Sequence, residues 1–498
     1  MSSLLNFLKK HRLLIFILVL GLSFRFYNYP NRWVLNQDQA RDVSIALYAI
    51  RNRTLPLLGS PSSAGPFNFG PLYDWLVIIT TLLFPFTSGP WVAFTLLSTL
   101  VIVIFYLIGR QFADHSTGLI FALTTAFAAG PIGNAPDMLN TVIVLFWVSL
   151  AFLCLTFLIT KKKIAYAIPL SFFIGAALNS HFQSLGLFAL LLSAFLINPF
   201  NFKQKIQTGF LFLFGFLLAF LPLLVFDITH KWIWIKSVFA YYTNGQNKFH
   251  VPIRWLTDLR DFWPQLWGST ILDLPYAGYF FLVLFFVAIY LYYHKHRRLP
   301  LPLIILTVSL LIQVVLLRYY KGVRSREYLI VFHSYFIFYT GWLLSVFIHT
   351  NRRLGQFLIG LFLLISCYSN YKIIQKTSQA KIILTFKKNI DSLHLGNFEY
   401  YVKNSPNDQL NTPLFYLLYK ENRINPSAYK IGTCYPKHDS DYCPSPEYII
   451  HQSTKPPYIL YNLSHLSSED LARLGFYQYT PKNIYERLFV NYPQALNN

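Results

Sequence analysis

The sequence predicts an all-α membrane protein that crosses the bilayer many times and carries a small mixed α/β domain at its C-terminal end. Of its 498 residues, 54% are hydrophobic and only 12% are charged, whereas an average soluble domain carries about 25% charged residues. Long apolar runs recur over the first three quarters of the chain. Each is long enough to span a bilayer at about 1.5 Å of helix per residue.

Twelve apolar segments are candidates for these helices. They are residues 13–27, 72–86, 91–109, 117–133, 138–160, 164–180, 184–199, 207–226, 274–293, 300–317, 328–348 and 354–373. The first segment follows Lys9, Lys10 and Arg12, and no small-residue cleavage site follows it before Arg25. We therefore expect an uncleaved first span with a cytoplasmic N-terminus.

Loop charge indicates which of the twelve segments cross the membrane. If all of them did, most basic clusters would lie outside, against the positive-inside rule. Segment 72–86 is the one to remove, because it is short, begins after Gly70 and Pro71, and contains Asp74. Such a segment is more typical of an interfacial helix than of a span. We therefore expect eleven spans, with an outer interfacial helix inside a first outer loop of residues 28–90.

The net charge of +22 comes mostly from residues 1–373, which hold 29 basic and 10 acidic residues. In a chain this apolar, the excess indicates orientation signals and contacts with anionic lipid rather than nucleic acid. With eleven spans, only Asp114 among these acids stays inside. The outer acids are Asp38, Asp42, Asp74, Asp137, Asp227, Asp258, Asp261, Asp273 and Glu327. We therefore expect chemistry at the outer face.

The composition changes after the membrane part, residues 1–373. In residues 374–498, Tyr, Asn, Pro and Lys replace the apolar runs, and strand-like pieces such as residues 458–461 stand between turn residues. We expect an extracytoplasmic mixed α/β domain here. In an oxidising compartment, Cys434 and Cys443 would form a disulfide.

The order of these features resembles the GT-C superfamily of membrane glycosyltransferases, in its protein O-mannosyltransferase and aminoarabinose-transferase branch. The resemblance covers roughly residues 10–350. It rests on Arg25, then QDQARD from Gln37, LPLLG, GPLYDWL, ALNSHFQSLGLFAL around His181, and LPLLVFDITHKW around Asp227. It implies an inverting enzyme that moves a sugar from a polyprenyl-phosphate carrier to an acceptor hydroxyl on the outer side of a membrane, which we expect to be a bacterial plasma membrane.

In this superfamily the first outer loop carries two adjacent acids, whereas here Gln39 follows Asp38. The resemblance implies that Asp38 is the catalytic base for the acceptor hydroxyl. Asp42 lies one helical turn later, with Arg41 beside it, and is the second catalytic candidate. The alternatives are that Asp38 is a helix N-cap and that Arg41 and Asp42 form a surface pair of little consequence.

Arg41 and four further residues are candidates for substrate binding. Tyr73 and Asp74 open the interfacial helix, Asp137 precedes the apolar segment 138–160, and His181 follows segment 164–180. Alternatively, Asp137 is a helix cap and His181 is an interfacial polar group satisfied by its neighbours.

The stretch RYYKGVRSRE brings together Arg318, Lys321, Arg324 and Arg326 on the expected outer side, where the positive-inside rule disfavours them. Arginine pairs with phosphate oxygens through two parallel hydrogen bonds. We therefore expect a phosphate clamp, the alternative being a site for anionic lipid headgroups.

The expected partners are a polyprenyl-phosphate-linked sugar, membrane lipids and an acceptor that is a glycan, a lipid or a protein. Some branches of the superfamily use a divalent cation and others do not, so Mg²⁺ or Mn²⁺ stays open as a cofactor. Two other classes remain: a lipid or solute transporter or flippase, and an inactive relative that binds a lipid-linked sugar. The clustering of acids at one face favours surface chemistry over a transport path.

Overall fold

The computed structural model describes residues 2–62, 67–244, 257–318, 324–378 and 380–391. Further along the chain it describes short pieces at 402–403, 413, 416–417, 420–421, 432–434, 448–452, 458–462 and 482–483. The chain folds as two compact units. The first joins Met1–Trp33 to Leu57–Thr377, and the second joins Val34–Pro56 to Ser378–Asn498.

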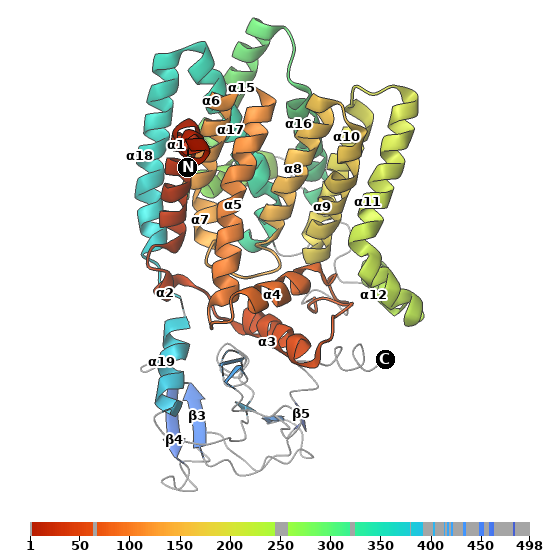
Figure 1. The fold of residues 1–498 in the computed structure, drawn as a ribbon, viewed down its shortest axis with the longest axis vertical. Helices are drawn as coiled ribbons and strands as arrows, with labels where there is room; N and C mark the ends of the chain where they lie inside the picture. Colours follow the sequence, from red (N-terminus) through yellow and green to blue (C-terminus); the bar gives the residue numbers. More distant parts are fainter. Residues whose placement is uncertain are drawn as a thin grey trace. The chain divides into compact units, whose positions relative to one another are not determined.

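The first unit is a bundle of helices (Figure 1). Its α-helices are α1 (Ser2–Phe26), α2 (Tyr29–Arg32), α4 (Leu72–Leu83), α5 (Gly89–Phe112), α6 (His115–Phe127), α7 (Ala129–Asn134), α8 (Val144–Lys161), α9 (Ala167–Ser180), α10 (Phe188–Ile197), α11 (Phe202–Thr229), α12 (Ile233–Asn244), α14 (Trp263–Leu272), α15 (Ala277–His296), α16 (Leu301–Arg318), α17 (His333–Thr350) and α18 (Arg352–Ile374). Short turns of other helix types are η1 (Ile164–Tyr166), η2 (Phe182–Leu187), η3 (Asp258–Phe262) and η4 (Arg326–Phe332).

Seven helices in the described part of the chain are long and apolar enough to cross a membrane. They are α5, α8, α11, α15, α16, the run Arg326–Thr350 and α18. Each of the eleven segments expected to cross contains helix. Segment 13–27 lies in α1, a 25-residue helix with four basic residues. The other three are shorter or interrupted; α6, for example, ends at Phe127, and Ala128 is extended before α7. The polytopic helical class is therefore confirmed with seven candidate spans, and the count of eleven stays a prediction.

The expected interfacial helix is present as α4, but it ends at Leu83 rather than at residue 86. Phe84 leaves the helical conformation, with φ −126° and ψ 75°, because it precedes Pro85. The 12 residues of α4 span only about 18 Å, against about 30 Å for a bilayer core. The helix is therefore shorter than a span, and its place at the outer membrane interface stays a prediction.

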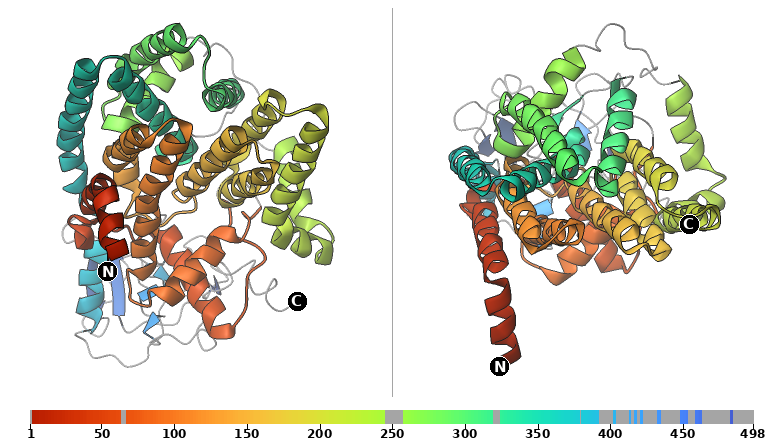
Figure 2. Two further views of the ribbon diagram at one scale, coloured as in Figure 1. Left: turned by 45° about the horizontal axis from the view of Figure 1, so that its top comes forward. Right: turned by 90° about the horizontal axis from the view of Figure 1, so that it is seen from above.

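Helix α17 forms the centre of the bundle and packs against α6, α15 and α18. It is apolar all round, and Tyr335, Phe338 and Trp342 are completely covered. By contrast, α11 and α12 lie at one edge of the unit in each view and expose many apolar side chains (Figure 1 and Figure 2).

Two buried arginines satisfy the carbonyl groups at three helix ends. Arg25 donates to the carbonyl oxygens of Gly21, Thr125 and Ala126 and, through Nε, to the Ser98 hydroxyl at 3.3 Å. Because the last carbonyls of a helix lack partners within it and carry a partial negative charge, a guanidinium is well suited to this position.

Arg32 plays the same part at the end of α1. Its Nη1 donates to the carbonyls of Phe24, Arg25 and Tyr27, and its Nη2 donates to Ile132 at the end of α7, at 2.9 Å. The two arginines therefore tie α1 to α6 and α7.

The second unit contains α3 (Gln37–Asn52), α19 (Ala380–Asp391) and five short strands. β1 (Val402–Lys403) runs parallel to β2 (Gly432–Cys434), which is antiparallel to β5 (Lys482–Asn483). β3 (Tyr448–Gln452) pairs antiparallel with β4 (Tyr458–Asn462), from Tyr448 opposite Asn462 to Gln452 opposite Tyr458.

The strand expected at residues 458–461 coincides with β4. The α/β class of residues 374–498 as a whole stays a prediction, because most of that segment lies outside the described residues. The predicted disulfide also stays untested: Cys434 ends β2, and Cys443 is not among the described residues.

The arginine contacts predict a stability effect. Replacing Arg25 by Leu leaves the carbonyls of Thr125 and Ala126 buried without their donor, which costs about 1–3 kcal/mol for each unsatisfied group. We expect Arg25→Leu to lower the thermal unfolding midpoint in detergent clearly. Ser98→Ala removes only the 3.3 Å hydrogen bond and should change the midpoint little, so equal midpoints for the two variants would contradict this account.

Candidate functional site

The start of α3 is organised by a capping box. The Asn36 side chain accepts a hydrogen bond from the Gln39 backbone N–H at 3.2 Å, and the Gln39 side chain accepts one from the Asn36 N–H at 3.0 Å. Asp38 is the second residue of the helix, so the alternative that it is the N-cap is wrong. The box also gives Gln39 a local role, because a glutamine at the third helical position completes this motif.

Arg41 joins the two acids of this helix. Its guanidinium binds Asp38 at 2.9 Å and Asp42 at 2.9 and 2.8 Å. Asp38 is 57% exposed, whereas Asp42 is only 2% exposed. The alternative of a surface pair therefore does not describe Arg41 and Asp42. Of the two carboxylates, Asp38 is the one that a substrate hydroxyl can reach.

In the first unit, a narrow hairpin precedes α4. Its two sides are held by hydrogen bonds of 2.9 Å from Gly59 N–H to Phe69 O and from Phe69 N–H to Ser60 O. Asp74, buried in the first turn of α4, accepts hydrogen bonds from the Ser60 N–H at 3.2 Å and from the Ser60 hydroxyl at 3.1 Å. The carboxylate of Asp74 therefore fixes the hairpin against the helix.

The hairpin ends in a close approach to α9. The N–H of Gly70 donates to the Asn179 carbonyl at 2.9 Å, and a Cβ on Gly70 would lie 1.6 Å from Asn179 Oδ1. The Asn179 amide is itself held, because its Nδ2 donates to the carbonyls of Gly175 and Ala219 at 3.2 Å each. Only glycine fits at position 70.

Tyr73 extends these contacts toward Asp137. Its buried hydroxyl donates to the Met138 carbonyl at 3.1 Å. Asp137 itself lies in the loop before α8, which begins only at Val144, and the N-cap of α8 is Ile143. The expected start of this span at residue 138 is therefore wrong, and so is the alternative of Asp137 as its cap.

His181 is surrounded by aromatic rings. Its imidazole lies 5.0 Å from the ring of Phe69 in the hairpin and stacks at 5.0 Å on Tyr328 of η4. Next to it, Phe182 stacks on Phe67 at 4.9 Å. The hairpin, η2 and η4 therefore meet at His181.

The same surroundings fix the charge and tautomer of His181. Burial lowers the pKa of His181 from 6.5 to about 4, so the ring is neutral at pH 7. Its Nδ1 accepts a hydrogen bond from the Gln183 N–H at 3.3 Å, which assigns the ring proton to Nε2. His181 is therefore a neutral hydrogen-bond donor.

The arginines expected to clamp phosphate differ in their surroundings. Arg324 binds both carboxylate oxygens of Asp258 at 3.1 Å and donates to the Leu317 carbonyl at 3.2 Å, beside the buried Arg318. Arg326, at the start of η4, is exposed. Lys321 lies outside the described residues.

Within the first unit these contacts link most of the predicted site. They run from the Met138 carbonyl, next to Asp137, through Tyr73, Asp74 and the hairpin to His181, and from there to Tyr328 of η4, the turn that begins at Arg326. Asp38, Arg41 and Asp42 form a separate group on α3 in the second unit. Sequence reasoning missed the parts of Ser60, Asp258 and Tyr328. Their partners lie 14, 66 and 147 positions away, and no local pattern marks such pairs.

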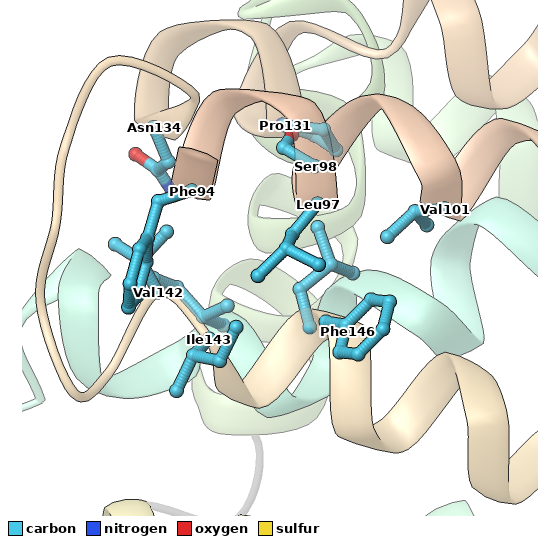
Figure 3. Close-up of a pocket in the computed structure, with 11 residues that line it drawn as sticks. Phe94, Leu97, Ser98, Val101, Pro131, Asn134, Val142, Ile143 and Phe146 are labelled. Atoms are coloured by element: carbon cyan, nitrogen blue, oxygen red, sulfur yellow. The ribbon is translucent and has the colours of Figure 1, made fainter. Parts of the chain in front are cut away.

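A small cavity lies between α5, the loop before α8, and α8 itself (Figure 3). Its volume is about 20 Å³, and only Ser98 and Asn134 among its lining residues have polar side chains. It has room for about one water molecule and is too small for a sugar. Among the described residues, no group of three His, Cys, Asp or Glu side chains could hold a metal ion.

Comparison with known proteins gives similarity in structure only. No protein-family model matches the chain, and no curated protein matches its sequence. Among solved structures, ArnT from Cupriavidus metallidurans bound to undecaprenyl phosphate matches with a TM-score of 0.58 and 10% identity, over 83% of this chain and 89% of that one. Apo ArnT matches with a TM-score of 0.51 and 12% identity, over 71% of this chain and 63% of that one.

The oligosaccharyltransferase of Archaeoglobus fulgidus matches with a TM-score of 0.45 and 15% identity, over 73% of this chain. The chain spans 55% of the length of that protein. ArnT and this oligosaccharyltransferase are both GT-C glycosyltransferases, and the match to ArnT confirms the fold that the motifs predicted.

The close approach at Gly70 predicts a site-specific cost. Gly70→Ala must displace the Asn179 amide from its two carbonyl partners, and we expect it to destabilise the protein by about 1–3 kcal/mol, as overpacking does. In Gly360→Ala the new Cβ meets nothing within 4 Å, and this helix substitution should stabilise by about 0.5–1 kcal/mol. Thermal unfolding of both variants tests this, and equal midpoints would refute the packing account.

The His181 environment predicts a pH dependence of stability. An unfolded histidine titrates near pH 6.5 and the folded one near 4, so between these values the unfolded chain binds the extra proton. The stability contribution of His181 therefore falls as the pH falls through this window, by up to about 1.4 kcal/mol per pH unit. Thermal midpoints between pH 7 and 4.5 should drop more steeply for wild type than for His181→Gln; parallel curves would show that the ring is not buried in its neutral form.

Proposed function

We propose that this chain, which has the fold of the GT-C membrane glycosyltransferases, transfers a sugar from a polyprenyl-phosphate donor to an acceptor hydroxyl. The observation that carries the proposal is the arrangement on α3: an exposed carboxylate, Asp38, is held by Arg41, whose other partner is the buried Asp42. The presence of undecaprenyl phosphate on ArnT, a protein of the same fold, supports the donor class.

In the proposed reaction Asp38 accepts the proton of the acceptor hydroxyl. The acceptor oxygen forms a bond to the anomeric carbon of the sugar while the bond from that carbon to the phosphate oxygen breaks. Polyprenyl phosphate leaves with the electron pair, and a single displacement inverts the anomeric centre. Arg41 orients Asp38, and buried Asp42 fixes Arg41 in turn.

The leaving phosphate needs positive charge near it. We propose that Arg318, Lys321, Arg324 and Arg326 supply this charge. Because Arg324 is paired with Asp258, a phosphate has to compete with that carboxylate, whereas Arg326 is open to solvent.

The remaining candidates hold the hairpin that ends at Gly70 in place, and we propose that they bind the substrate together with this hairpin. His181 offers its Nε2–H as a donor, and Tyr73, Asp74 and Asp137 lie on the same run of contacts. A divalent cation remains open as a cofactor. From the loop charges we propose eleven spans in a bacterial plasma membrane, with this site and residues 374–498 on the extracytoplasmic side.

The first test uses purified protein and a panel of labelled polyprenyl-phosphate sugars. We expect wild type to release free polyprenyl phosphate from one donor in the presence of acceptor, and Asp38→Asn to lose at least about 100-fold of that rate, as expected for loss of a general base. Asp261→Asn is the matched control, because Asp261 is also an aspartate paired with a neighbouring arginine. It should keep its activity.

Near-normal turnover by Asp38→Asn would refute its role as the base. Absence of release from every donor, with the lipids still bound, would instead favour a flippase or an inactive binder.

The Asp258–Arg324 pair allows a second test, which measures the affinity for polyprenyl phosphate without the transfer reaction. Removing the Asp258 charge frees Arg324, so Asp258→Asn should tighten the binding of polyprenyl phosphate about fivefold, equivalent to about 1 kcal/mol. Asp273→Asn, in the same outer segment but after α14, should leave the affinity unchanged. Weaker binding by Asp258→Asn would show that this pair organises the loop rather than competes with phosphate.

A further inference from the structure

Helix α11 carries a continuous apolar stripe that nothing in the described protein covers. The stripe follows the helix by steps of three and four residues to its last turn. Its members are Phe210, Leu213, Phe214, Leu217, Leu218, Leu221, Val225 and Ile228. Because α11 is a candidate membrane span, this stripe is its lipid-facing side.

The chain then turns sharply into α12, and the turn is fixed. Asp227 accepts hydrogen bonds from the backbone N–H groups of Trp234 at 2.8 Å and Ile235 at 3.1 Å, which caps α12 at its start. Lys231 and Trp232 adopt positive φ values of 57° and 63°, a conformation that is strained for a non-glycine residue. The cap and these two residues set the direction of α12, which leaves the end of α11 at an angle (Figure 1 and Figure 2).

Helix α12 has two distinct sides. Trp234, Val238 and Tyr241 follow one side and are half-buried. Ile235 and Phe239 lie on another side, four residues apart, and are 49% and 69% exposed; Trp232, just before the helix, is 45% exposed. Lys236 and Ala240 lie on the flank beyond them and are exposed.

The charges of this segment have one sign. Between Ile228 and Asn244 the chain contains Lys231 and Lys236 and no acidic residue. The preceding acid, Asp227, is buried and used as the cap. An apolar stripe with adjoining lysines and a tryptophan at its start is typical of a helix that lies in the headgroup region of an anionic membrane.

We propose that α12 lies in the membrane interface at the Thr229 end of α11, with Trp232, Ile235 and Phe239 inserted among the phospholipids and Lys236 at the headgroups. Continuity supports this occupant, since α12 begins four residues after the span ends and both helices expose apolar side chains. This inference does not depend on the transferase assignment.

The other side of α12 connects the membrane surface to the candidate site. The Trp234 indole N–H donates to the Asn68 carbonyl at 2.8 Å, and the Tyr241 ring lies 5.1 Å from Phe67. Both partners belong to the hairpin that ends at Gly70. A helix seated in the interface therefore fixes the height of this hairpin, and with it His181, relative to the lipid headgroups.

The test measures the surroundings of two neighbouring positions in nanodiscs that contain anionic phospholipid. A ketone-bearing amino acid introduced at position 239 or 240 and modified with a nitroxide leaves the four cysteines unchanged. The electron paramagnetic resonance signal then reports collisions with oxygen, which concentrates in lipid, and with a water-soluble nickel chelate.

For each label we compare its collision rate with oxygen to its collision rate with the nickel chelate. We expect this ratio to be at least about threefold higher at position 239 than at position 240, which lies 100° around the helix. Equal access of both labels to the nickel chelate would place α12 in water and overturn the proposal. Poor access of both reagents to position 239 would also overturn it, because another protein surface or a second copy of the chain would then cover the stripe. The binding of polyprenyl-phosphate sugars by the labelled proteins, measured separately, tests the transferase proposal.

Discussion

The burial of backbone carbonyl groups at helix ends is the constraint on which the architecture of the first unit depends. A helix that ends inside a membrane protein leaves its last carbonyls without water, and an unsatisfied polar group there is costly. Arg25 and Arg32 provide the donors for α1, α6 and α7. The first helix is thereby fixed to the bundle just before the chain enters its first loop. The complementary need, acceptors for the unpaired N–H groups at a helix start, is met at α12, where the Asp227 carboxylate accepts from Trp234 and Ile235.

The candidate site divides its acids by burial. Asp42 and Asp74 are buried and hydrogen-bonded, Asp258 neutralises Arg324, and Asp38 combines exposure with a positioned partner. A buried carboxylate that is already paired holds its neighbours in place, whereas a base has to be reached by its substrate. This difference supports the proposal that Asp38 carries the chemistry, while the others position loops and side chains. His181, neutral and protonated on Nε2, suits donation rather than proton abstraction.

Local sequence signals predicted much of this architecture. Apolar length and loop charge identified α4 as too short to cross, and the shift in composition marked where the apolar part ends. The ends of helices were less predictable. The apolar run after Asp137 begins with turns, so α8 starts six residues later than expected. Asn36 rather than Asp38 caps α3, because the box with Gln39 satisfies two backbone donors at once.

Local sequence patterns could not predict the contacts that define the site. Only the packing of segments that are distant in the sequence creates these pairs. They are Ser60 with Asp74, Phe69 and Tyr328 with His181, and Asp258 with Arg324. The sequence placed three of these residues, Asp74, His181 and Arg324, among the site candidates, because each is polar or charged where the chain was expected to leave the membrane. It gave no reason to select their partners, and Asp258 appeared only as one of several outer acids.

The most direct test of the central claim is a cryo-electron microscopy structure of the protein in nanodiscs with a polyprenyl phosphate bound. The account predicts density for the phosphate against Arg326, with Arg324 turned from Asp258 toward it. A phosphate bound elsewhere in the bundle would contradict the proposed transfer reaction.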